Sequence, residues 1–215
     1  MAVEKFLFMR ALLERLGDSG FLNRATAITL RVLAALIVLF SLTTFFKVGQ
    51  LIFKLPANSI LGGVLFEVFF VLAVYAVAHV LVIRAGEISR LVPGEHHALP
   101  LAPILLRAAG ETYSAFVILV AIGGGIFVWF TSLKLSNSNI LNPVIQFLMP
   151  TPRADVSFMG GIEFMLSGIL AGIAALVLAY IAADVFRLLL RDRRPMTEVV
   201  RNNGENGYKT RFGGQ

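Results

Sequence analysis

One apolar stretch of the sequence, residues 60–83, carries side chains that could do acid–base chemistry. Glu67 and His79 are ionisable, and Tyr75 adds a phenol one helical turn before His79. An ionisable group at membrane depth is costly, so it usually pairs with a neighbour or belongs to an ion or proton path. The chemistry available to this chain therefore depends on what surrounds these three side chains.

A structural interpretation gives Glu67 an ion-pair partner. The segment 55–59 reads LPANS, a composition that favours a tight turn between two helices. If the turn centres on Ala57, an antiparallel hairpin places Lys47 opposite Glu67, and His79 opposite a small residue that leaves room for its ring. A Lys47–Glu67 pair would then satisfy both groups and fix the register of the hairpin.

A proton or ion path is the alternative. Glu67, Tyr75 and His79 extend over about 18 Å of one helix and could relay protons if water entered between them. A four-helix bundle of this size fills its interior with side chains. Conduction would therefore need several copies of the chain, with Glu67 forming a ring of carboxylates.

The remaining residues do not predict a cofactor, a metal site or a reaction. A b-type haem usually needs two axial histidines at membrane depth, and His79 is the one found there. Glu95, His96 and His97 fit a solvated loop better than a metal site, because adjacent side chains point apart. The chain has no cysteine and no hydrolase, zinc-protease, phosphate-loop or dinucleotide motif. We therefore expect a protein that is not an enzyme.

Composition places the chain in the membrane class. Hydrophobic residues make up 57% and charged residues 15%, and the mean hydropathy is +0.81. Crossing a bilayer takes roughly 20 apolar helical residues. The expected fold is an all-α integral membrane protein with four transmembrane helices in two antiparallel hairpins, at about 26–50, 60–83, 113–135 and 161–185.

The segments on either side of the spans differ in character. Residues 1–20 predict an amphipathic helix that lies on the cytoplasmic membrane surface, although docking on a partner protein has the same pattern. We expect residues 21–186 to hold the transmembrane domain and residues 187–215 to form a basic, mobile cytoplasmic tail. The helix and the tail are expected to be extramembrane.

The basic residues predict the orientation. Most of the 19 Lys and Arg residues precede the first span, follow the last, or lie between the second and third. The positive-inside rule therefore puts both termini in the cytoplasm, and we expect a bacterial inner membrane. This pattern explains the net charge of +6 as topology and attraction to lipid, without a nucleic-acid partner.

Charged residues near the span ends are expected to pair as interfacial anchors. Arg107 and Glu111 have the i, i+4 spacing of a helical ion pair. Asp184 is expected to pair with Arg187 or Arg84. These pairs would hold the spans at the correct depth.

The fourth span carries a seam of small residues, which favours close helix packing. Its neighbour could be the 123–125 glycine run of the third span or a helix of another chain. We expect an accessory, assembly or scaffold subunit that packs against the lipid bilayer and against other membrane subunits or itself. The predicted seam residues are Gly161, Gly168, Gly172, Ala175 and Ala179.

Overall fold

The computed structural model describes residues 19–57, 59–91, 101–131 and 157–191, and this part of the chain is helical without strands. Its elements are α2 (Ser19–Ile52), α3 (Ile60–Ser89), α4 (Leu101–Thr131) and α6 (Phe158–Arg191). The predictions for the N-terminal amphipathic helix and the His96–His97 loop lie outside the described residues, as does most of the predicted tail. The three-part division of the chain stays a prediction.

All four helices are long and apolar enough to cross a membrane. The predicted all-α membrane class is therefore confirmed, but the helices have 30 to 34 residues and exceed the predicted spans. The start of α4 differs most from the prediction, because α4 begins at Leu101 and the predicted span began at about 113. The added residues, which include Arg107 and Glu111, extend the helix beyond the apolar run. Pro103 fits in its first turn, where a backbone N–H has no helical partner.

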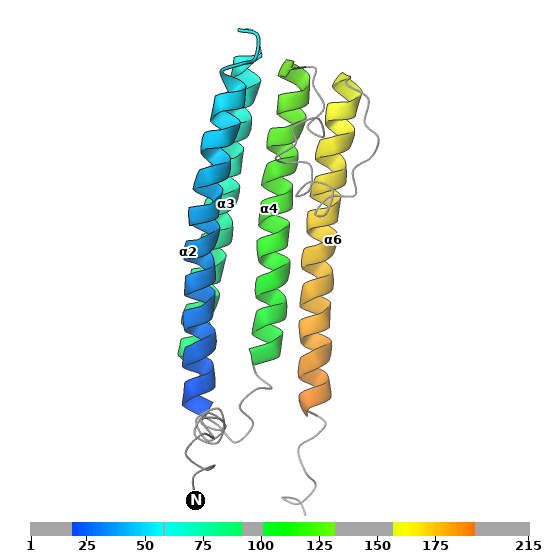
Figure 1. Cartoon of the computed structure of the whole chain (residues 1–215). Coiled ribbons are helices and arrows are strands. Elements are labelled where there is room, and N and C mark those ends of the chain that lie inside the picture. The colour runs from blue at the N-terminus through cyan, green and yellow to red at the C-terminus, as the bar shows by residue number, and fades with distance from the viewer. Residues whose placement is uncertain (1–18, 58, 92–100, 132–156, 192–215) are drawn as a thin grey trace, which may run out of the picture.

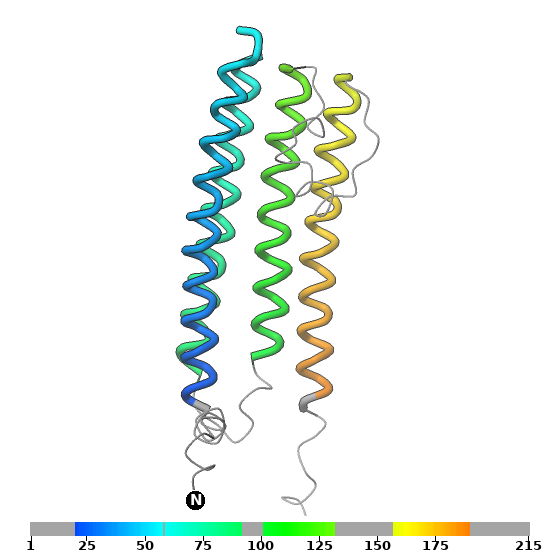
Figure 2. Tube along the Cα trace, in the orientation of Figure 1, coloured from blue at the N-terminus to red at the C-terminus, as the bar shows by residue number. Residues whose placement is uncertain are grey.

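The helices form an open row in chain order. α2 packs on α3, α3 on α4 and α4 on α6, whereas the other pairs have marginal contact. Consecutive helices run in opposite directions, and α2 and α6 lie at the two sides of the row (Figures 1 and 2). The packing of α3 on α4 joins the four helices continuously, so the predicted division into two hairpins is not confirmed.

The inner helices of the row hold more of the core. In the most apolar 18-residue stretch, 39% of α3 and 44% of α4 is buried, against 17% in each of α2 and α6. Ala73, Val117 and Ala121 are fully buried at the α3–α4 contact. α2 and α6 therefore present most of their apolar surface outward, as expected of helices in lipid.

Candidate functional site

The best-connected polar side chains lie where α3 ends and α4 begins, which we call the Arg84 end. Arg84 of α3 donates from Nε to Glu111 Oε2 of α4 at 2.9 Å and from Nη2 to Glu111 Oε1. A third bond runs from Arg84 Nη1 to Glu87 Oε2 at 2.5 Å. The bidentate geometry suits a guanidinium and a carboxylate, and it ties α3 to α4.

The same cluster extends to α6. The Tyr180 hydroxyl donates to Glu111 Oε1 at 2.5 Å. Arg107 donates from Nη2 to Asp184 Oδ1 at 2.7 Å, and its guanidinium lies 4.8 Å from the centre of the Tyr180 ring. Three helices thus share one network of charges, and each carboxylate in it has a cation within reach. This arrangement supports a structural role at the Arg84 end.

The network agrees in part with the pairs expected from the sequence. Asp184 forms the expected ion pair with Arg187 at 3.9 Å, but its closer partner is Arg107. Glu111 binds Arg84 in place of the expected Arg107. Sequence spacing identifies neighbours on one helix but not the helix that faces them. Depth in the membrane is the sequence signal that could have predicted the network. Arg84, Glu111 and Tyr180 all lie a few turns from the helix ends at the Arg84 end of the bundle.

Glu67 lies near the opposite end of α3, which we call the Glu67 end. Its Oε1 atom is buried and has no hydrogen-bond partner. The expected ion pair with Lys47 does not form within the described residues, and Lys47 is exposed. Glu67 instead faces Gly49, where Oε1 lies 3.1 Å from the position that a Cβ atom would take. A carboxyl group without a partner therefore sits in the α2–α3 contact.

Helix register explains why the pair is absent. Gly63 packs on Ile52, and Glu67 lies against Gly49, so the facing residues are shifted by one to two positions from a turn centred on Ala57. A shift of two residues rotates a side chain by about 200° around a helix. Lys47 consequently points away from the α2–α3 contact.

Tyr75 and His79 lie on a different face of α3 from Glu67. Their rings stack at 5.6 Å with an interplanar angle of 17°. Tyr75 is 64% exposed, and His79 is also exposed and does not pack into the α2–α3 contact as expected. Glu67 is turned toward α2, so one copy of the chain does not assemble the predicted three-residue path.

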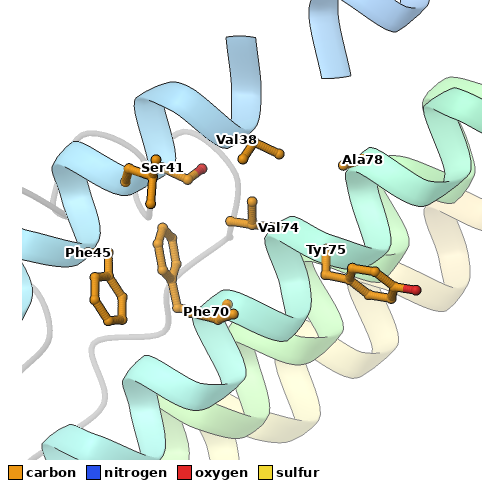
Figure 3. A pocket seen from close by; sticks show the side chains of 9 residues that line it. Val38, Ser41, Phe45, Phe70, Val74, Tyr75 and Ala78 are labelled. Atoms are coloured by element: carbon orange, nitrogen blue, oxygen red, sulfur yellow. The ribbon is translucent and has the colours of Figure 1, made fainter. Parts of the chain in front are cut away.

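A groove of about 290 Å³ lies between α2 and α3, beside the Tyr75 ring. Figure 3 shows the rings of Phe45 and Phe70 along it, with Val38 and Val74 nearby. The lining is almost wholly apolar, which suits a hydrocarbon chain or an apolar side chain and offers no acid–base pair. The described residues also contain no cluster of metal-ligating side chains.

The predicted small-residue seam lies along the α4–α6 contact. A methyl group on Gly161 would overlap Trp129 and lie tightly against the backbone of Gly125, and one on Gly172 would overlap Ile118. Gly168 is buried as well. Ala175 and Ala179 lie against Gly110 of α4. The sequence left open whether the seam packs on the third span of the same chain or on another chain. In this structure it packs on α4 of the same chain.

The described residues form four helices that are long and apolar enough to span a membrane, which defines the chain as an integral membrane protein. Comparisons with protein-family models, curated proteins and solved structures found no match for this chain.

Proposed function

We propose that this chain is a non-enzymatic accessory, assembly or scaffold subunit of a membrane complex, and that it acts through helix packing. The supporting observation is the open row of helices. α2 and α6 each pack on one neighbour and leave broad apolar surfaces uncovered. Partner subunits can bind such surfaces without disturbing the row.

The cluster at the Arg84 end supports this proposal. It joins α3, α4 and α6 through charge-assisted hydrogen bonds, which are stronger than neutral ones. A rigid three-helix unit of this kind can hold α2 and any bound partner at a fixed position. The bacterial inner membrane and cytoplasmic termini belong to the same proposal and rest on the distribution of basic residues.

Photo-crosslinking in the native membrane tests the proposed role. A photoreactive amino acid replaces Phe40 of α2, which is 67% exposed, or Leu170 of α6, which is 65% exposed. Ala73, which is fully buried, gives the matched control position. We expect adducts with a different membrane protein from at least one outer position and none from Ala73. Lipid adducts alone at both outer positions would contradict the proposal.

A homo-oligomeric ion or proton conductor is the second candidate, and the unpartnered Glu67 oxygen favours it. Tyr75 and His79 would then serve from the outer face of α3 once several copies assemble. The test is ion and proton flux into vesicles that contain the purified chain, with Glu67→Gln as the variant. Flux that Glu67→Gln abolishes while assembly persists would support conduction, and absence of flux in the parent chain would exclude it.

A further inference from the structure

Tyr75 and His79 are polar side chains without a hydrogen-bond partner on an uncovered helix face. They contact each other by stacking, and neither donates to or accepts from another group within the described residues. Tyr75 is 64% exposed, whereas the phenylalanines of α3 are buried or half-buried. The phenol and the imidazole are thus available to a molecule outside the chain.

Tyr75 and His79 lie at membrane depth, where a polar group without a hydrogen-bond partner costs free energy. Arg84 marks the charged end of α3, and Tyr75 and His79 precede it by nine and five residues, or about 13 Å and 7 Å along the helix. The hydrocarbon layer is about 30 Å thick, so the phenol lies near its centre, too deep to reach water. Lipid tails have no hydrogen-bonding groups, and polar groups in hydrocarbon lose free energy unless a partner is found.

The surrounding face has the spacing of a helix-packing seam. We call it the α3 outer strip. Its members recur at intervals of four and three residues, as in paired helices, and three of its apolar side chains are 46% to 50% exposed. Nothing lies within 4 Å of a Cβ position at its last residue, which leaves room for a neighbouring backbone. The strip consists of Val68, Leu72, Tyr75, His79, Val82 and Gly86.

We propose that the α3 outer strip binds a second copy of this chain, with the Tyr75 phenol of each copy donating a hydrogen bond to the His79 imidazole of the other. The strip carries both a donor and an acceptor, so a two-fold pair satisfies both without another polar residue. In two copies inserted in the same orientation, Tyr75 of one copy and His79 of the other differ in depth by four residues, about 6 Å. Side chains at this offset contact each other when the strips interdigitate as knobs into holes. A foreign helix would need its own polar group at that depth.

The dimer does not depend on the proposed accessory role. A dimer can form a part of a larger complex, and the purified chain can be tested alone. The Arg84 end and the α4–α6 seam lie on other faces, so pairing through the strip leaves both undisturbed.

Cysteine crosslinking tests the interface directly, because the chain has no cysteine of its own. Val82→Cys places one thiol on the strip. Val177→Cys of α6 is the matched control, since both valines are 50% exposed and lie at similar depths beside Arg84 and Tyr180, which share Glu111. In phosphatidylethanolamine and phosphatidylglycerol vesicles, oxidation should link Val82→Cys into dimers far more than Val177→Cys. Equal yields, or more from Val177→Cys, would overturn the proposal.

A second experiment tests the hydrogen bonds. Tyr75→Phe with His79→Leu keeps the strip apolar and removes the donor and the acceptor. Energy transfer between labelled chains, measured while the vesicles are diluted with lipid, should show dimerisation about tenfold weaker than in the parent. Unchanged monomer helicity and thermal stability would show that folding is intact. Parent-like dimerisation by the folded double variant would overturn the proposed contact.

Discussion

The two ends of the bundle differ in whether their buried carboxyl groups have hydrogen-bond partners. At the Arg84 end, Glu111 accepts hydrogen bonds from Arg84 and Tyr180, and Arg107 pairs with Asp184 through Nη2 although its Nε atom is buried without a partner. At the Glu67 end, one carboxylate oxygen is buried against Gly49 without a partner. Paired charges join helices, whereas an unpaired group does not. The contrast predicts that α3, α4 and α6 form the stable unit and that α2 is held mainly by apolar packing.

The largest effect is expected from Glu111→Gln. This change removes the carboxylate that Arg84 binds through two hydrogen bonds in a partly buried site and leaves it with the more exposed Glu87 alone. We expect a loss of about 2–3 kcal/mol, below the 3–5 kcal/mol seen when a fully buried pair is broken. The measurement is reversible unfolding in mixed detergent micelles. A loss under about 0.5 kcal/mol, the range of ordinary surface changes, would mean that the network does not hold the helices together.

Gly110→Ala is expected to come next, because its methyl group would overlap Ala179 of α6. Overpacking typically costs about 1–3 kcal/mol, which outweighs the gain of up to about 1 kcal/mol that alanine brings to a helix. Gly86→Ala is the matched control for unfolding of the single chain, measured with micelles in excess so that no dimer forms through the α3 outer strip. Open space surrounds that position within the chain, and the change should keep or raise stability. Equal effects of the two variants on unfolding would contradict the close α4–α6 contact.

Asp184→Asn should have a smaller effect than Glu111→Gln. The Asp184 side chain is 60% exposed, and water screens its pair with Arg107. Exposed pairs contribute about 0.2–1 kcal/mol, so the unfolding midpoint should shift only slightly, and less at high salt. A loss of stability as large as that of Glu111→Gln would show that the α4–α6 pair contributes as much to stability as the α3–α4 pair.

The smallest effect is expected from Glu67→Gln, the same substitution at the opposite end. No cation loses its partner, so stability should change by less than about 0.5 kcal/mol or increase. The unfolding experiment used for Glu111→Gln provides the direct comparison. A loss of similar size at both positions would show that Glu67 has a stabilising partner and that the two ends do not differ.

The sequence predicted the elements better than their contacts. A run of about twenty apolar residues is enough to predict a span without knowledge of its neighbours. The four predicted helices are confirmed. Contacts between helices also depend on rotation, and a register shift of two residues separates Lys47 from Glu67. Arg84 and Glu111 are 27 residues apart, a pairing that no local spacing specifies. The small-residue seam was more informative than the predicted ion pairs, because a run of glycines indicates close helix packing even when the neighbouring helix is unknown.

The proposed role is tested most directly by native mass spectrometry of the assembly extracted from its own membrane in a mild detergent. We predict that the 23.4 kDa chain will be found with one or more foreign membrane subunits in fixed stoichiometry, whether it is present in one copy or two. An assembly that contains this chain alone would contradict an accessory role and favour the conductor that uses Glu67.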